Sequence, residues 1–325
     1  AEIALKNSLE RMNKKKGVVI ISDPRSGEIR AFVSLPAYDN NAFAGGISKK
    51  EYKKLLDDPL RPLFNRAVYG EYPSGSTIKP IVAAAALQEK IVTPETKIRS
   101  TGGIHVGQWT FPDWKAGGHG ITTVKKAIAE SVNTYFYIIG GGYGDIQGLG
   151  IDRLATYFTK FGLGEKTGID LLGERSGFVP TQSWKEEVKN EPWYIGDTYH
   201  VAIGQGDVLV TPLQVNEYTQ YFANNGTSYV PHLVHSIIDS PTQNTRTVTP
   251  EVYKKDLVLL EHVTTVREGM RRTVTDGSAR RLSTLPITSA GKTGTAQWGG
   301  PGKAPHAWFT GWAPYEKPEL AITVL

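Results

Sequence analysis

The chain carries, near its start, the stretch VVIISDPRSGEIRAFVSL from Val18 to Leu35. Its two halves, Val18 to Ser22 and Ile29 to Leu35, are rich in β-branched and apolar residues, which is typical of strands. The residues between them, Asp23 to Gly27, have the composition of a tight turn. The stretch therefore predicts two antiparallel strands joined as a hairpin.

The far end of the chain has a similar character. Gly- and Pro-rich turns separate three further predicted strands, at Ile287–Ala290, Ala307–Ala313 and Leu320–Leu325. Between the two ends, apolar residues recur on one helical face at Thr77–Lys90, Thr122–Ile139 and Ile151–Phe161. This order predicts an α+β fold, with an antiparallel sheet built from both chain ends, flanking helices and a mostly helical insertion. No repeat or long linker divides the sequence, so residues 1–325 are predicted to form one domain.

Composition narrows the possible functions. The 325 residues are 39% hydrophobic, enough for a large core, yet no apolar run approaches the roughly 20 residues of a membrane-spanning helix. The net charge is +5, and the basic run Lys14 to Lys16 precedes a strand, which disfavours nucleic-acid binding. There is no cysteine, which excludes disulfides, thiolate zinc sites and a cysteine nucleophile.

A candidate nucleophile lies at the start of the first predicted helix. Ser76 and Lys79 are three residues apart, so on a helix they share a face and the lysine amine can reach the serine hydroxyl. Pro80 removes a backbone donor, which is tolerated only at a helix start, where N–H groups point outward and can form an oxyanion hole. Taken alone, the pair is far more typical of an N-cap serine with a solvated lysine.

Two later elements favour a catalytic site. Ser131 and Asn133 interrupt an apolar helical stretch, where polar residues are poor choices unless they line a cleft. The second element, Gly291 to Thr295, follows a predicted strand and offers a cation and two hydroxyls on an open backbone. A phosphate-binding loop would need glycine where this chain has Pro286, so a nucleotide site is disfavoured.

Ser-x-x-Lys, Ser-x-Asn and Lys-Thr-Gly in this order form the signature of the penicillin-recognising serine enzymes. The chain resembles class B penicillin-binding proteins over nearly its whole length, and this resemblance also rests on Asn65-Arg66-Ala67, Gly204-Gln205-Gly206, Thr211-Pro212 and His306-Ala307-Trp308-Phe309. The rod-elongation branch, penicillin-binding protein 2, is suggested by Asp113-Trp114-Lys115, Gly118-His119-Gly120, Trp193-Tyr194 and Gly196-Asp197-Thr198. The family's membrane anchor, non-catalytic N-terminal region and C-terminal end are not found in the sequence.

The resemblance implies a peptidoglycan D,D-transpeptidase that cross-links stem peptides during cell-wall elongation and is acylated by β-lactams. It implies catalytic roles for Ser76, Lys79, Ser131, Asn133 and Lys292, and binding of substrate or β-lactam by Thr293, Gly294 and Thr295. Burial and the Lys292 cation would both lower the pKa of Lys79. Three alternatives stay open: a D,D-carboxypeptidase or β-lactamase, a non-catalytic β-lactam sensor, and a structural scaffold.

We predict neither a metal nor a cofactor. Some homologues of the elongation branch carry a structural zinc held by two aspartates, a histidine and a cysteine. Here Asp113 and His119 match, but Val132 stands at the cysteine position and Ser100 near the other aspartate. Asp113 and His119 are instead interpreted as a hydrogen-bonded pair.

The resemblance also predicts partners and location. Peptidoglycan stem peptides and β-lactam antibiotics are the expected ligands, and a membrane glycosyltransferase is the expected partner of the full-length protein. The expected location is the outer, periplasmic face of the cytoplasmic membrane, with the present residues forming a soluble part.

Overall fold

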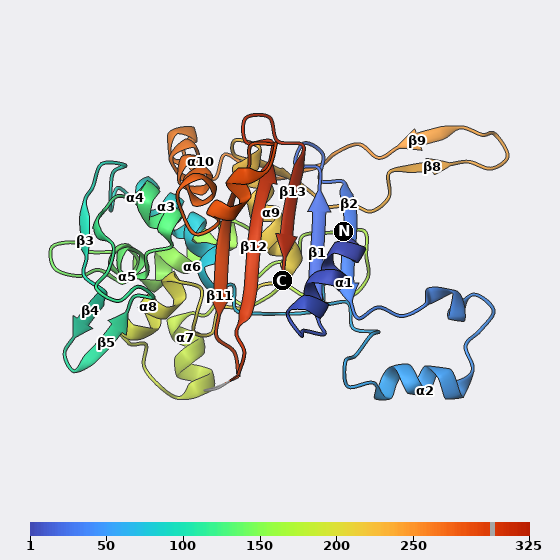
Figure 1. Cartoon of the computed structure of the whole chain (residues 1–325), viewed down its shortest axis with the longest axis horizontal. Helices are drawn as coiled ribbons and strands as arrows, with labels where there is room; N and C mark the ends of the chain where they lie inside the picture. Colours follow the sequence, from blue (N-terminus) through green and yellow to red (C-terminus); the bar gives the residue numbers. More distant parts are fainter. Residues whose placement is uncertain (300–302) are drawn as a thin grey trace.

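A five-stranded antiparallel sheet forms the centre of the computed structural model, which describes residues 1–299 and 303–325. The strand order is β11-β12-β13-β1-β2 (Figure 1). The bounds are β1 Gly17–Ser22, β2 Ile29–Leu35, β11 Ala290–Ala296, β12 His306–Ala313 and β13 Leu320–Val324. The sheet thus combines both chain ends, as the sequence predicts.

Strand β1 joins the two ends of the chain within this sheet. It pairs with β2 through the predicted hairpin and with β13 on its other side, where Val19 lies opposite Val324. Successive side chains of a strand point to opposite faces, so Val18 packs in one hydrophobic cluster with Leu213 while Val19 packs in another with Leu5 of helix α1 (Glu2–Arg11). Apolar layers therefore cover both faces of the sheet.

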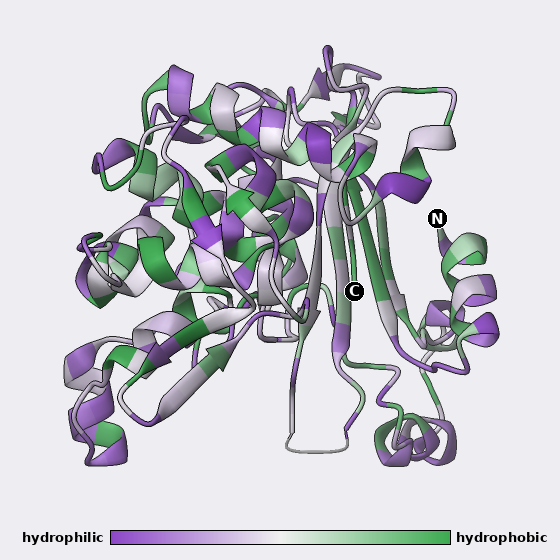
Figure 2. Cartoon of the chain, turned by 60° about the vertical axis from the view of Figure 1, so that its left-hand side comes forward, coloured by the Kyte–Doolittle hydropathy of each residue, from purple (hydrophilic) through white to green (hydrophobic). Residues whose placement is uncertain are grey.

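Most of the helices lie on the face opposite α1, and Figure 2 shows them as one body beside the apolar strands. Helix α9 is buried along its whole length, and α10 packs against both α4 and β11. The α-helices of this region are α3 Lys79–Gln88, α4 Val124–Glu130, α5 Asn133–Gly141, α6 Gly150–Lys160, α7 Gln182–Trp184, α8 Ile195–Ala202, α9 Pro212–Ala223 and α10 Leu260–Thr275. Shorter helical turns are η2 Gly75–Ile78, η3 Lys185–Lys189 and η4 Arg280–Thr284.

Two segments project from the body, as Figure 1 shows. One contains η1 (Asn40–Phe43) and α2 (Lys49–Asp57), and the other is the hairpin of β8 (Ser236–Ile238) and β9 (Thr245–Thr247). The remaining strands form two-stranded pairs: β3 Ile98–Ser100 with β6 Gly120–Thr122, β4 Gly103–Val106 with β5 Trp109–Pro112, and β7 Thr227–Tyr229 with β10 Val252–Lys255. Among the described residues, no helix has the length and apolar character needed to cross a membrane.

The structure corrects two predicted elements. The predicted helix Thr122–Ile139 is two helices, because Ser131 adopts a left-handed backbone (φ 59°) that ends α4. The predicted strand Ile287–Ala290 is wrong in position, since β11 begins at Ala290 and contains the Lys-Thr-Gly segment rather than preceding it. The sequence of β11 consists largely of glycine, lysine and threonine. It lacks the apolar alternation of β2 and β12, so its pattern does not predict a strand.

Candidate active site

Ser76 lies in the helical turn η2, directly before α3. The backbone N–H of Lys79 donates to the Ser76 carbonyl, and Pro80 occupies the first turn of α3, as the sequence predicts. The loop before Ser76 is held by two bonds, from the Gly75 N–H to the Gly204 carbonyl (2.8 Å) and from Trp308 Nε1 to the Pro73 carbonyl (3.0 Å). Ser76 is therefore carried by a fixed turn and is half-buried.

This turn packs directly on the Lys-Thr-Gly strand. A Cβ atom on Gly294 would lie 2.9 Å from Thr77 Cγ2 and 3.1 Å from the Ser74 carbonyl oxygen. Only glycine therefore allows β11 to approach η2 this closely. The first and third motifs, separated by more than two hundred residues, become the two walls of one site.

Lys79 joins the first motif to the second. Its side chain is fully buried, and Nζ donates to Asn133 Oδ1 (2.6 Å), to the Ser131 carbonyl (2.9 Å) and, more weakly, to Ser131 Oγ (3.4 Å). The Phe136 ring lies 5.1 Å from the amine. In the described part of the chain, the Ser76 hydroxyl makes no hydrogen bond to this amine. Such bonds are often loose in unliganded enzymes and tighten with substrate.

Burial sets the electrostatics of the two lysines. It lowers the pKa of Lys79 to about 7, with the Asp113 carboxylate acting in the opposite direction. Burial also lowers the pKa of Lys292 well below its usual value, and the Lys79 cation lowers it further. The repulsion between the two cations lowers the pKa of Lys292, whereas burial and Asp113 are the causes that shift the pKa of Lys79. Near neutral pH, Lys79 can exchange a proton.

Asp113 holds the second motif in place, a role that sequence reasoning missed. Its carboxylate accepts the backbone N–H groups of Asn133 (3.2 Å) and Thr134 (2.8 Å) and the Thr134 hydroxyl (2.7 Å). These N–H groups belong to the first turn of α5, which has no intrahelical partners for them. Asp113 therefore caps α5 from a distant loop and fixes Asn133 beside Lys79.

The interpretation of Asp113 and His119 as a hydrogen-bonded pair is wrong. His119 Nε2 is 3.6 Å from Asp113 Oδ1 and has no hydrogen-bond partner among the described residues, while Nδ1 lies 2.6 Å from Glu130 Oε2. The Ser100 hydroxyl is engaged with the His119 N–H and with Thr134 (both 3.2 Å). Together with the buried apolar Val132, these residues do not fit a four-ligand zinc centre. In the part of the chain that the structure describes, no group of three His, Cys, Asp or Glu side chains could hold a metal ion. The absence of zinc itself stays a prediction.

The residues predicted to bind substrate, Thr293, Gly294 and Thr295, lie on β11 beside Lys292. Lys292 is buried and donates from Nζ to the Thr293 carbonyl (2.9 Å). Thr293 is half-buried and Thr295 is exposed. The Thr293 hydroxyl lies 2.6 Å from that of Ser278, a neighbour that no sequence motif indicates.

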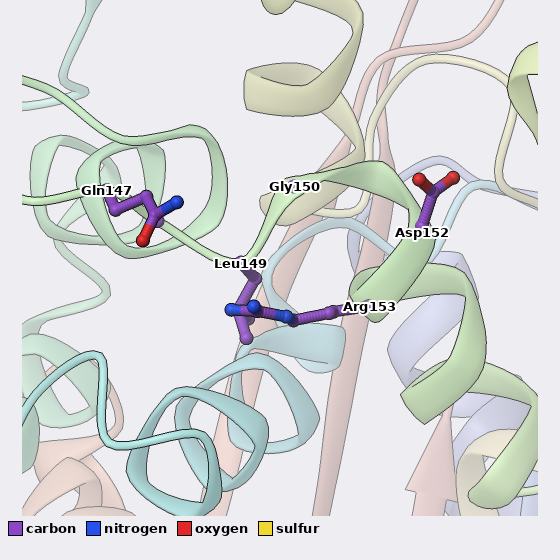
Figure 3. A pocket seen from close by; sticks show the side chains of 6 residues that line it. Gln147, Leu149, Gly150, Asp152 and Arg153 are labelled. Carbon is purple, nitrogen blue, oxygen red and sulfur yellow. The ribbon is translucent and has the colours of Figure 1, made fainter.

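A surface hollow of about 300 Å³ lies elsewhere, around the start of α6 (Figure 3). It is lined by Gln147, Gly148, Leu149, Gly150, Asp152 and Arg153, none of which the sequence analysis selected. Figure 3 shows that the Asp152 carboxylate and the Arg153 guanidinium point in different directions. Arg153 forms a wide ion pair with Glu89 (3.7 Å), so its charge is already matched. Nothing in this hollow converges on a reacting group.

Comparison with known proteins agrees with the geometry. Two curated relatives are named peptidoglycan D,D-transpeptidase MrdA: that of Haemophilus influenzae is 38% identical over 97% of this chain and 50% of the relative, and that of Escherichia coli K12 is 36% identical over 95% and 51%. The chain thus spans about half the length of these relatives.

Solved structures give the same result. Penicillin-binding protein 2 of Pseudomonas aeruginosa, in complex with WCK 5153, superposes with a TM-score of 0.84 at 34% identity, covering 99% of this chain and 71% of that one. The Helicobacter pylori protein in complex with MreC gives 0.83 at 37% identity, covering 98% and 57%. Residues 17–325 also match the family described as the penicillin binding protein transpeptidase domain. The chain therefore belongs to the penicillin-binding protein transpeptidase family, and its fold is that of this family.

Proposed function

We propose that this chain is the catalytic part of a peptidoglycan D,D-transpeptidase that forms an acyl-enzyme on Ser76. The observation that carries the proposal is the fully buried Lys79 amine, which is bonded to Ser131 and Asn133 and has a pKa lowered to about 7. A lysine in that state serves as a general base near neutral pH. The names of the relatives support the choice of reaction.

Acylation begins when Lys79 takes the proton of Ser76, whose oxygen attacks the carbonyl between the two terminal D-alanines of a stem peptide. The backbone N–H groups of Ser76 and Thr295 stabilise the oxyanion. Ser131 relays the proton from Lys79 to the leaving amine, so that D-alanine departs as the acyl-enzyme forms. Asn133 binds the substrate amide.

The second half of the reaction transfers the acyl group to an amine of a neighbouring stem peptide. The amine loses a proton to the base, the new amide bond forms, and Ser76 regains its hydroxyl. Thr293 and Thr295 bind the terminal carboxylate of the donor, and Lys292 contributes to the electrostatics of the same wall. A β-lactam acylates Ser76 but retains its leaving group, so the acyl-enzyme persists.

Mass spectrometry after incubation with penicillin tests the proposal. We expect one covalent equivalent on Ser76, stable for hours, and none in the Ser76→Ala variant. Rapid loss of the adduct would instead identify a β-lactamase. Transpeptidation is then tested with a stem-peptide donor and an added acceptor amine, since a carboxypeptidase would release the hydrolysed product alone.

The partners and the location belong to the same proposal. The neighbouring structures include a complex between penicillin-binding protein 2 and MreC and a peptidoglycan synthase complex that coordinates polymerization and crosslinking. By analogy, the full-length protein works with a membrane glycosyltransferase on the periplasmic side of the cytoplasmic membrane. We expect the full-length protein to co-purify with such a polymerase. We also expect the full-length protein to be missing from extracts prepared without detergent.

A further inference from the structure

The loop between α10 and η4 connects two walls of the site. The Ser278 N–H donates to the Ala129 carbonyl (3.0 Å), two residues before Ser131, and the Ala279 N–H donates to the Thr273 carbonyl (2.8 Å). A Cβ atom on Gly277 would overlap the Ala129 carbonyl oxygen, so glycine is required for this approach. The backbone of Ser278 is therefore fixed against the end of α4.

From this fixed position the Ser278 side chain reaches β11. Its Oγ lies 2.6 Å from Thr293 Oγ1, a short hydroxyl pair in which either oxygen can donate. Ser278 is exposed and Thr293 half-buried, while the adjacent Lys292 is fully buried. The pair thus lies at the surface of the protein, where a ligand can reach it, next to a buried amine.

A hydroxyl has one proton to donate and two lone pairs that accept. When an anion approaches Thr293, the favourable arrangement has Ser278 donating to Thr293 and Thr293 donating to the anion. The bond from Ser278 occupies a lone pair of Thr293, turns its proton toward the ligand and strengthens the outer bond cooperatively. Without Ser278 the Thr293 hydroxyl can rotate freely.

We propose that Ser278 is a positioning residue for carboxylate recognition. It acts through the Thr293 hydroxyl to select acyl-donor substrates that end in a free carboxylate. The inference rests on the proposed function, because it concerns the ligand of the same site. It assigns the loop 276–279 a part in specificity that none of the three sequence motifs contains.

The test compares a penicillin with its methyl ester, which keeps the reactive amide but loses the negative charge. The second-order acylation rate of Ser76 is measured for both compounds. In the wild type we expect the acid to react faster than the ester. In Ser278→Ala the acid rate should fall about tenfold, as for a weakened hydrogen bond to a charged group, while the ester rate stays unchanged.

Three further variants separate positioning from general damage. Ser278→Thr keeps the hydroxyl and should keep the acid preference. Ser283→Ala removes a nearby exposed serine, whose hydroxyl donates to the Arg280 carbonyl, and should change neither rate. In a Thr293→Val background, Ser278→Ala should have no additional effect on the acid, because the two residues act as one unit.

Equal losses for acid and ester in Ser278→Ala would overturn the inference, since they would indicate a structural defect of the cleft. An unchanged acid rate would overturn it too. If neither compound acylates the wild type, the proposed function itself fails and the inference falls with it.

Discussion

The cleft and the contact between α10 and the sheet both bury cationic side chains, but they satisfy them differently. Arg267 on α10 donates to the carbonyls of Phe222, Ala223 and Tyr315, and its guanidinium lies over the Trp312 and Tyr315 rings. Burial lowers the pKa of Arg267, yet a guanidinium with its donors engaged stays charged at all accessible pH.

In the cleft, Lys79 and Lys292 share a buried space with the Asp113 carboxylate as the nearby counter-charge. An ammonium is more easily deprotonated than a guanidinium, and burial makes the neutral amine the favoured form. All three side chains donate to backbone carbonyls, so the difference lies in the proton: a buried guanidinium keeps its charge and holds structure, whereas a buried amine can release its proton and take part in chemistry. Substitutions at Lys79, Arg267, Asp113 and Lys292 test this distinction.

The largest expected effect is on the cleft. Lys79→Ala should reduce the acylation rate by roughly 10²- to 10⁴-fold at every pH, because the general base is lost. Lys79→Arg should not rescue it, since a guanidinium does not release its proton. The measurement is the second-order rate of penicillin acylation. A near-normal rate in either variant would move the base to another residue.

Arg267→Met should act on stability instead. It leaves the carbonyls at the end of α9 buried without donors, which costs about 3 kcal/mol of unfolding free energy. Denaturant unfolding measures this loss of stability. Arg267→Lys can reach fewer carbonyls than arginine, so its unfolding free energy should lie between those of the wild type and Arg267→Met. The folded fraction should acylate at nearly the wild-type rate. A large loss of acylation with unchanged stability would contradict the structural role.

Asp113→Asn keeps an acceptor for the α5 N–H groups but removes the charge. The Asp113 carboxylate raises the pKa of Lys79, so its removal lowers that pKa. Acylation requires the neutral amine and therefore rises with pH through about 7 in the wild type. In the variant this rise should occur at lower pH. Asp152→Asn, at the surface hollow, is the matched control and should leave the profile in place.

Lys292→Ala should have the smallest effect on the pH midpoint of the acylation rate. Burial and the Asp113 carboxylate are the causes that shift the pKa of Lys79, so the loss of Lys292 should leave that pKa nearly unchanged. The plateau rate should fall, but the midpoint should remain at about 7. A midpoint that moves upward in the rate profile against pH would show that Lys292 is charged when Lys79 titrates.

Sequence reasoning found the strands whose apolar pattern is local. β1, β2, β12 and β13 agree with their predictions, because alternation and turn composition act within a few residues. It missed the break at Ser131, since the carboxylate that caps α5 comes from Asp113, far back in the chain. Local propensity cannot predict a contact between residues that are distant in the sequence.

The candidate site follows the same division. Motif order suggested which residues meet, and the structure brings Lys79 to Ser131 and Asn133. The partners that hold these groups, such as Glu130 on His119 and Ser278 on Thr293, carry no sequence signal because serine and glutamate are common on any surface.

The pairing of β1 with β13 has a consequence for synthesis. Val19 of β1 pairs with Val324 of β13, about 300 residues later in the chain, so β1 and β13 cannot pair until β13 has been synthesised. Because ribosomes add about 5–20 residues per second, roughly 15 to 60 seconds pass between the synthesis of β1 and that of β13. Throughout this interval, the first hairpin has an open, apolar edge that can pair with other chains. We therefore expect the nascent chain to depend on a holding chaperone until β13 emerges.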